Sequence, residues 1–314
     1  MIGNSAPRAH RLVVGLDIGA DRVRGVVTAP GGRVVEAEEW HTRPERGPDA
    51  VVDTVLGCAA ELVGGARRSR ARVTAVGVAV QGAVDDVSGV VERAATLGWW
   101  GTPLRTWLEE HLGLPVTVAG RSHAAAVAES RIGAGRGCER FALVSVGDDV
   151  EATEVLAGFP HDGEGAEPLG HVAVWRGWAE CWCGSRCCPA TAVPVPALVR
   201  RNADVPGGGG TAADVLRGTA RGGRAAALAR HEAVDALAEA LVPLAARVDR
   251  LALGGDAAER AGIVLLGPLG AGLAARLPHR TAPELVTARL GARAASLGAA
   301  LIAGEPRAAV GSAV

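Results

Sequence analysis

The chain has 314 residues, 48% of them hydrophobic, which suffices for two cores at the usual size of about 150 residues per domain. Its 33 basic residues are all Arg and nearly balance 34 acidic ones, so no global positive field favours nucleic acid or an anionic membrane as a partner. Because Lys is absent, a P-loop type of phosphate site, which needs a lysine, is excluded.

Targeting and membrane signals are not apparent in the sequence. No uninterrupted apolar run of about 18 residues occurs, and the first ten residues form a short polar leader without the apolar run of a signal peptide. We therefore expect a cytoplasmic protein that does not enter a membrane. Four of the six cysteines lie at positions 181, 183, 187 and 188, and in a cytosolic protein this clustering favours metal ligation over disulfides.

The first half of the chain predicts alternating strands and helices. Apolar runs and turn residues predict strands at Leu12–Gly19, Val23–Val27, Arg33–Glu36, Val73–Val80 and Val116–Val118. Helices are predicted from Pro48, from an N-cap at Thr102 with Pro103 as first helical residue to Gly113, and from a cap at Ser122 to Ile132.

The second half continues the alternation. We expect a strand at Phe141–Val146, a glycine-rich loop at Asn202–Gly210, helices near Thr211–Arg221 and His231–Val248, a strand at Ile263–Leu266 and a closing helix at Leu290–Ala303. Strands that alternate with helices in this way favour an α/β fold with helices packed on the faces of a sheet.

The strongest local motif is the string GHVAVWRGWAECWCGSRCCPA. It places His171, Cys181, Cys183 and Cys188 within eighteen residues, which is enough for a tetrahedral zinc site with all four positions filled by the protein. Such a closed site is structural, because it leaves no position for a catalytic water. Cys187 could replace Cys188 as the fourth ligand, and the spacing alone does not decide between them.

These motifs together resemble the ROK (repressor, open reading frame, kinase) family. The family carries Gly-His and, ten residues on, Cys-x-Cys-Gly-x-x-Gly-Cys, which Gly170-His171 and the string from Cys181 to Cys188 match in spacing, with Cys187 in place of Gly. The resemblance covers roughly residues 12 to 304 and includes further stretches at Asp17-Ile18-Gly19, Gly77 to Asp85, Leu97-Gly98-Trp99, Ala124 to Gly137 and Leu290 to Ala303.

The resemblance implies a two-lobed actin-like (RNase H-like) ATPase fold of the sugar kinase/ROK type. It places an N-terminal lobe at residues 1–119 plus about 288–314 and a C-terminal lobe, carrying the zinc loop, at 120–287. It also implies a homodimer and a small-molecule ligand between the lobes. Family repressors carry a winged helix-turn-helix ahead of the first strand, where this chain has only about eleven residues, so we expect no direct binding of nucleic acid.

The catalytic base of the family kinases is altered. They use an Asp inside Glu-Asn-Asp-Ala-Asn, and the corresponding string Ala119-Gly120-Arg121-Ser122-His123 puts Arg121 at that position. A guanidinium stays protonated in proteins and cannot accept a proton. His123 is the candidate for a replacement base, because imidazole titrates near neutrality. A further hypothesis is that Arg121 binds an anionic metabolite. The helix dipole disfavours a positive charge at a helix N-terminus unless an anion lies nearby.

The sugar contacts implied by the family are altered as well. The Glu of Glu-Ile-Gly-His is replaced in Pro168-Leu169-Gly170-His171, and the Glu that follows the last zinc cysteine is replaced in Cys188-Pro189-Ala190. Each lost charge-assisted hydrogen bond is worth roughly 1.5 to 3 kcal/mol, so we expect ordinary hexoses to bind weakly.

The phosphate turns of the family have also changed. The first, Asp-Ile-Gly-Gly-Thr-Lys in kinases, ends here in Ala-Asp-Arg after Gly19, and the second has carboxylates among the residues that follow Gly147. Carboxylates in such turns repel phosphate, which argues against Mg-ATP binding, although Asp17 could still hold magnesium. The positions left for a nucleotide are Asp17, Gly19, Gly147 and Gly267.

We therefore expect a ROK-family protein that has kept its structural zinc site and lost phosphotransfer, a pseudo sugar kinase that acts as a ligand-binding or partner-binding regulatory protein. The alternative is an active, glucokinase-like ATP-dependent sugar kinase with a rearranged site, which would need a base other than Arg121.

Overall fold

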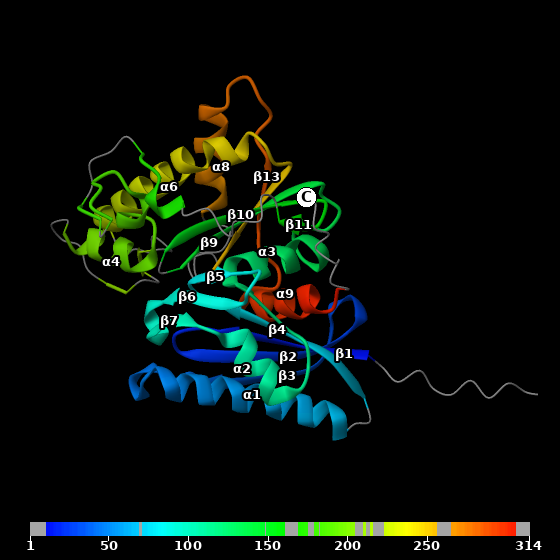
Figure 1. Cartoon of the computed structure of the whole chain (residues 1–314). Coiled ribbons are helices and arrows are strands. Elements are labelled where there is room, and N and C mark those ends of the chain that lie inside the picture. Colours follow the sequence, from blue (N-terminus) through cyan, green and yellow to red (C-terminus); the bar gives the residue numbers. More distant parts are fainter. Residues whose placement is uncertain are drawn as a thin grey trace, which may run out of the picture. The chain divides into compact units, whose positions relative to one another are not determined.

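A computed structural model describes residues 11–68, 71–147, 149–160, 169–174, 179–181, 183–204, 210–211, 214–215, 223–255 and 265–305. The chain divides into two compact units, unit 1 (residues 1–128 and 293–314) and unit 2 (residues 129–292), coloured along the sequence in Figure 1. Among the described residues, no helix combines the length and apolar character needed to cross a bilayer.

Unit 1 contains a five-stranded mixed sheet with the strand order β3-β2-β1-β4-β8. Its strands are β1 (Arg11–Ile18), β2 (Arg22–Ala29), β3 (Arg33–His41), β4 (Arg72–Val80) and β8 (Val116–Gly120). A smaller sheet holds β5 (Ala83–Asp85), β6 (Val90–Ala94) and β7 (Trp99–Thr102). The observed strands β1, β2, β4 and β8 confirm the strands that the apolar runs predicted at these places.

The helices of unit 1 are α1 (Pro48–Arg68), α2 (Leu104–Leu112), α9 (Ala294–Ala303) and the first part of α3 (Arg121–Ile132). Helix α1 covers one face of the larger sheet, where its Val55 and Leu62 join the strand core of Leu16 and Val78. Helix α9 covers the opposite face (Figure 1). It packs closely, since a Cβ on Gly77 would lie 1.9 Å from the carbonyl oxygen of Ala299.

Unit 2 contains a five-stranded sheet in the order β11-β10-β9-β12-β13. Its strands are β9 (Arg140–Val146), β10 (Val150–Leu156), β11 (Phe159–Pro160), β12 (Arg250–Gly254) and β13 (Glu284–Thr287). Helices α4 (Val195–Ala203), α6 (Gly223–Ala245) and α8 (Leu266–Arg276) bury a core of small aliphatic side chains against it. Long Ala-rich α6 supplies many of these core residues, as its composition predicts.

Several helix boundaries differ from the prediction. Thr102 does not cap α2, because it pairs with Val91 as the last residue of β7, and Pro103 occupies the cap position. Helix α3 already begins at Arg121, so Ser122 lies in its first turn. Gly113 does end α2, in the left-handed conformation (φ 62°) that favours glycine.

Other differences lie in unit 2. The prediction of a strand at 263–266 is wrong at Leu266, which begins α8. Residues 263 and 264 lie outside the described residues. The expected loop at 202–210 begins later, because Asn202 and Ala203 belong to α4, and residues 205–209 are outside the described part. The helix expected at 211–221 is described as helical only at residues 214–215.

Candidate functional site

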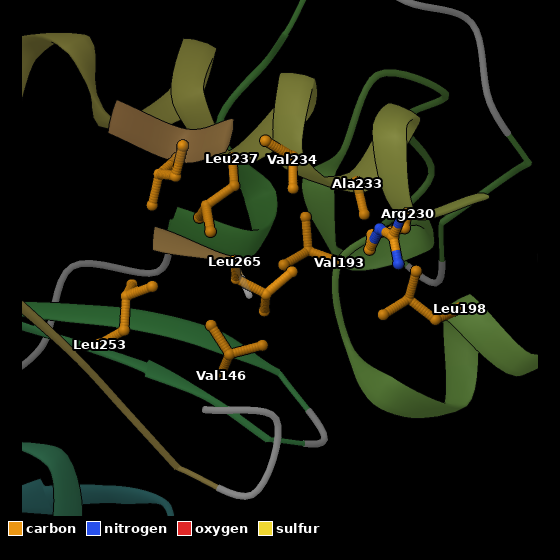
Figure 2. Close-up of a pocket in the computed structure, with 10 residues that line it drawn as sticks. Val146, Val193, Leu198, Arg230, Ala233, Val234, Leu237, Leu253 and Leu265 are labelled. Carbon is orange, nitrogen blue, oxygen red and sulfur yellow. The ribbon is translucent and has the colours of Figure 1, made fainter. Parts of the chain in front are cut away.

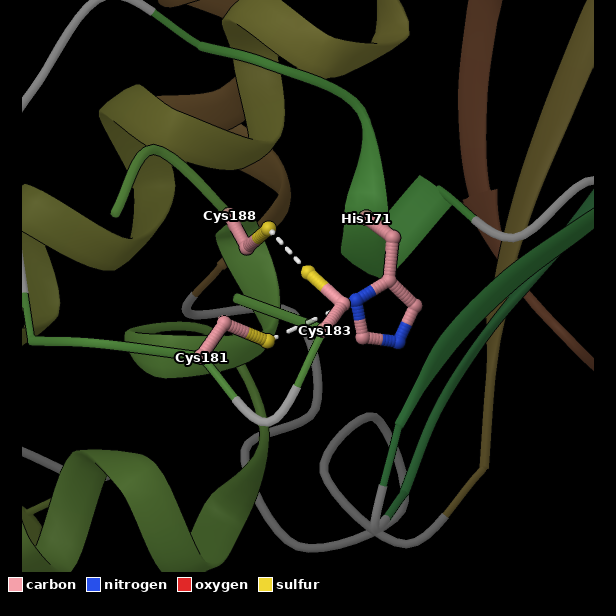
Figure 3. A group of neighbouring side chains, drawn as sticks. All are labelled: His171, Cys181, Cys183 and Cys188. Atoms are coloured by element: carbon pink, nitrogen blue, oxygen red, sulfur yellow. Dashed lines mark hydrogen bonds between the residues drawn. The ribbon is translucent and has the colours of Figure 1, made fainter. Parts of the chain in front are cut away.

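The four predicted metal ligands come together in unit 2. His171 ends the short helix η4 (Leu169–His171), and Cys188 directly precedes η5 (Pro189–Thr191). Between them, Cys181 and Cys183 belong to a turn that the Gly184 N–H closes by donating to the Cys181 carbonyl at 2.8 Å, and Gly184 adopts a positive φ of 85°. Their ligand atoms, one from each residue, all lie within 4.8 Å of one another (Figure 3).

The distances within this cluster fit a tetrahedral site. Cys181 Sγ lies 3.5 Å from His171 Nδ1, and Cys183 Sγ lies 3.4 Å from Cys188 Sγ. Ligands around one zinc ion, at about 2.3 Å for sulfur and about 2.0 Å for nitrogen, are separated by roughly 3.5 to 3.8 Å. Three thiols and one imidazole are donors that suit a soft or borderline divalent metal, so the cluster could hold a metal ion.

The cluster also bears on the choice left open by the sequence. Cys188 is buried and contributes its sulfur, whereas the neighbouring Cys187 is not one of the four clustered residues. Burial raises the pKa of the Cys188 thiol to about 12. Hydrogen bonding from the backbone of Ser185, aided by Cys188, lowers the pKa of the exposed Cys183 to about 7.

In unit 1, the two predicted positions Asp17 and Arg121 meet in an ion pair. Arg121 Nε lies 2.9 Å from Asp17 Oδ1, and its NH2 group donates a 3.1 Å hydrogen bond to Oδ2. Asp17 is the residue before the last one of β1 and is 0% exposed, and the Arg121 side chain is 34% exposed. Burial raises the pKa of Asp17, and the charges of Arg121 and Arg24 oppose this.

The guanidinium of Arg121 also lies against the first phosphate turn of the family pattern. The Gly19 N–H donates to the Arg22 carbonyl and closes the turn between β1 and β2. A Cβ on Gly19 would lie 3.7 Å from NH1 and 3.8 Å from NH2 of Arg121. Arg121 thus lies beside both Asp17 and Gly19, the two positions that the sequence analysis named as candidates for magnesium and phosphate.

His123, the candidate replacement base, has an acidic neighbour. Its Nδ1 lies 3.6 Å from Asp86 Oδ2, and both residues belong to unit 1. Burial lowers the pKa of His123 while the charge of Asp86 opposes this, and burial raises the pKa of Asp86. A neutral imidazole beside a carboxylate is an arrangement that can accept a proton on the other ring nitrogen.

The remaining nucleotide positions, Gly147 and Gly267, are close in sequence to residues that line an apolar cavity of about 30 Å³ in unit 2. Val146, at the end of β9, lines it directly before Gly147, and Leu265 and Leu269 line it on either side of Gly267 (Figure 2). Arg230 is the one charged residue in its described lining, which otherwise consists of Val146, Val193, Leu198, Ala233, Val234, Leu237, Leu253, Leu265 and Leu269.

Two partners in unit 1 were missed by the sequence reasoning. Arg24 NH1 lies 3.8 Å from Asp17 Oδ2, and Asp86 faces His123. The tight turn after β1 offers a signal for the first, because a hairpin of this length pairs Asp17 directly with Arg24. Asp86 follows the short strand β5 and faces helix α3, and no local pattern connects these segments.

Comparison with known proteins decides the family. A profile described as "ROK family" matches residues 13–305. The chain belongs to the ROK family. Its fold is therefore the α/β, actin-like ATPase fold of the ROK sugar kinases, as predicted, and solved ROK structures agree. A ROK hexokinase from Thermus thermophilus is 29% identical with a TM-score of 0.81, over 93% of this chain and 97% of the other.

Several other proteins that are similar to this chain are named as glucokinases or as a kanosamine kinase. A kanosamine kinase from Amycolatopsis mediterranei is 30% identical over 93% of this chain and 95% of its own length. A glucokinase from Halalkalibacterium halodurans is 27% identical, but the match spans only 61% of this chain and 59% of that protein. A Streptomyces griseus glucokinase solved with glucose and AMPPNP is 27% identical, with a TM-score of 0.76 over 93% and 99% of the two chains.

Proposed function

We propose that this ROK protein is of sugar kinase descent and binds a small-molecule ligand without transferring phosphate. The observation that carries the proposal is the ion pair between Arg121 and Asp17. In the kinases that the chain resembles, these two positions supply the base and a metal-binding carboxylate. Here one is an arginine, and it is bonded to the other.

The chemistry of this pair argues against phosphotransfer. Arginine stays protonated and cannot take the proton of an attacking hydroxyl. A divalent cation at Asp17 would have to displace or face the guanidinium, which lies 2.9 Å from one carboxylate oxygen and 3.1 Å from the other. General acid–base catalysis typically contributes 10²–10⁴-fold to a rate, so its loss alone would leave turnover slow.

We infer that the His171 and cysteine cluster holds a structural zinc ion. All four tetrahedral positions would be filled by protein atoms, so the ion would have no open position for water or substrate. Zinc would fix the segment between the short helix η4, which ends at His171, and the short helix η5, which begins directly after Cys188. In small zinc modules, such binding contributes on the order of 10 kcal/mol to folding.

A second candidate function is that of an ATP-dependent sugar kinase with a rearranged base. The names of its relatives, glucokinase and kanosamine kinase, favour this reading. The specific observation behind it is the pair of His123 and Asp86: burial lowers the pKa of His123 and favours the neutral imidazole, and Asp86, 3.6 Å away, would orient the ring. The base would then act from a position two residues beyond Arg121.

The experiment that separates the two candidates measures ADP release with Mg-ATP. The substrates are a panel of hexoses, N-acetylhexosamines and kanosamine, with a known sugar kinase as positive control. For the non-catalytic protein, release stays at background for every sugar while the zinc content and cooperative unfolding show intact protein. Sugar-dependent release that His123→Gln abolishes would establish the kinase and reject our first proposal.

Ligand identity is addressed by a melting-temperature screen of sugars, sugar phosphates and carboxylates. If Arg121 anchors an anionic metabolite, anionic compounds raise the melting temperature of the unmodified protein and not of Arg121→Gln. We also propose a homodimer, by analogy with the family. Light scattering across a concentration series measures the molar mass and tests it.

A further inference from the structure

Asp149 stands beside the metal cluster, in a turn where the family's kinases carry glycines for phosphate. Its carboxylate Oδ2 lies 3.4 Å from His171 Nε2, and its side chain is 40% exposed. The opposite ring nitrogen, Nδ1, is the one that faces Cys181 Sγ at 3.5 Å. One imidazole thus has a candidate metal-binding nitrogen on one side and a carboxylate on the other.

This division of the two ring nitrogens is the one expected of a metal-bound histidine. When a histidine binds a metal through one nitrogen, the other usually donates its N–H to a carboxylate or carbonyl, which fixes the tautomer and the ring orientation. Nδ1 must be deprotonated to bind a metal, so Nε2 would carry the proton, on the side of the ring that lies 3.4 Å from Asp149 Oδ2.

The local backbone holds Asp149 in place for this contact. Asp149 Oδ1 accepts a 2.7 Å hydrogen bond from the Val150 N–H, which leaves Oδ2 for the imidazole. The Asp149 carbonyl accepts from the Gly147 N–H at 3.0 Å, which closes the turn between β9 and β10. These bonds orient the carboxylate before any metal binds.

Gly170 makes room for this carboxylate. A Cβ built on Gly170 would lie 2.2 Å from Asp149 Oδ1, well inside contact distance. The glycine directly before His171 therefore permits Asp149 to reach the histidine. An alanine there would displace the carboxylate while leaving all four metal ligands and Asp149 itself in the sequence.

We propose that Asp149 is a positioning residue of the metal site: it accepts a hydrogen bond from His171 Nε2 and holds the imidazole ready to bind the ion through Nδ1. The inference rests on the proposed metal site. The turn from Gly147 to Val150, which corresponds to the second phosphate turn of the family pattern, would then support the metal site instead of a nucleotide. The Asp149 carboxylate that accepts from His171 would repel a nucleotide phosphate bound at the same turn.

The test measures zinc affinity by competition with a chromogenic chelator, together with the ligand-field spectrum of the cobalt-substituted protein. Asp149→Ala is expected to weaken zinc binding about 10- to 100-fold, the range found for lost outer partners of metal ligands. Asp149→Asn, which keeps an acceptor for Val150, should lose less. The matched control is Glu151→Gln, an equal change in charge on the same hairpin.

A double-mutant cycle separates positioning from a general effect on folding. If Gly170→Ala acts by displacing the carboxylate, it weakens zinc binding in the unmodified protein but adds little in the Asp149→Ala background. The cobalt spectrum should change in both single variants, since the orientation of the imidazole changes. Loss of fold alone would lower the melting temperature without this coupling.

The outcomes keep the two proposals apart. If the unmodified protein binds neither zinc nor cobalt, the metal site itself is rejected, and the role of Asp149 with it. If it binds zinc but Asp149→Ala binds as tightly as Glu151→Gln, with an unchanged cobalt spectrum, the role of Asp149 is rejected and the metal site stands.

Discussion

Arg121 and Asp17, which lie 104 residues apart in the sequence, are joined by two contacts, Nε to Oδ1 at 2.9 Å and NH2 to Oδ2 at 3.1 Å. The second contact is a hydrogen bond, whereas Oδ1 has no hydrogen-bond partner among the described residues and faces the guanidinium as an opposite charge. It places the first residue of α3 at the end of β1. The buried carboxylate would otherwise face only Arg24, at 3.8 Å.

Arg121→Ala is expected to destabilise the protein by about 3 kcal/mol, because it leaves a fully buried carboxylate with a single, more distant cation. Urea unfolding of both proteins measures the difference. The control Arg121→Ala/Asp17→Asn removes the charge as well and should recover most of the lost stability. An Arg121→Ala protein as stable as the unmodified one would show that the pair contributes nothing.

Stability should depend on pH through His123. Burial lowers its pKa in the folded state below 6.5, so below pH 6.5 the unfolded chain binds more protons at this residue than the folded protein does. Its contribution is therefore present above pH 6.5 and is lost as the pH falls toward the folded-state pKa. The raised pKa of Asp86 acts in the opposite direction at lower pH.

The measurement is urea unfolding at several pH values for the unmodified protein and His123→Gln. The difference between their unfolding free energies should shrink or change sign in favour of the glutamine variant as the pH falls below 6.5. A difference that stays constant from pH 7.5 to about pH 5 would contradict the assigned shift.

Glu129 ties the end of α3 to the segment after β13. It is fully buried, and its carboxylate accepts from the N–H groups of Ala134 at 2.7 Å, Arg289 at 2.8 Å and Leu290 at 2.7 Å. Glu129→Ala leaves these donors without the carboxylate and should cost about 3 kcal/mol or more. Calorimetry would measure the loss, with the exposed Glu38→Gln as a control that should change little.

Close packing of α9 makes Gly298 irreplaceable. A Cβ there would lie 1.7 Å from the carbonyl oxygen of Ala124, so Gly298→Ala must separate α9 from α3 and should strongly lower the melting temperature. Gly57 in α1 has nothing within 4 Å of such a Cβ, and Gly57→Ala should raise stability by about 0.5 to 1 kcal/mol. Equal melting temperatures for the two variants would refute the packing argument.

Metal removal should loosen unit 2. A strong chelator is expected to lower the melting temperature and to release about one zinc per chain, because the four ligands lose their common partner. Cys188→Ser should reproduce the loss, whereas Cys187→Ser, one residue away and outside the cluster, should keep its zinc. Zinc loss in both variants, or in neither, would argue against the proposed ligand set of His171, Cys181, Cys183 and Cys188.

The sequence by itself determined the features that depend on neighbouring residues. Runs of Val and Leu predicted β1 and β4, since strands buried on both faces are apolar throughout. The four clustered side chains were also predicted, because they lie within eighteen residues and thiols and imidazole are recognisable in the sequence as possible metal ligands. Both features depend on residues that are close together in the sequence, so they can be predicted without knowing how the rest of the chain folds.

Tertiary structure alone decided the partners of these residues. The separation of Arg121 from Asp17 depends on how β8, β4 and β1 align in one sheet, and that register is set by packing against α1 and α9. Backbone turns bring Cys188 into the cluster and leave Cys187 outside it. They also place Asp149 beside His171. Contacts between distant segments are fixed only when the whole core is packed, and no local pattern encodes them.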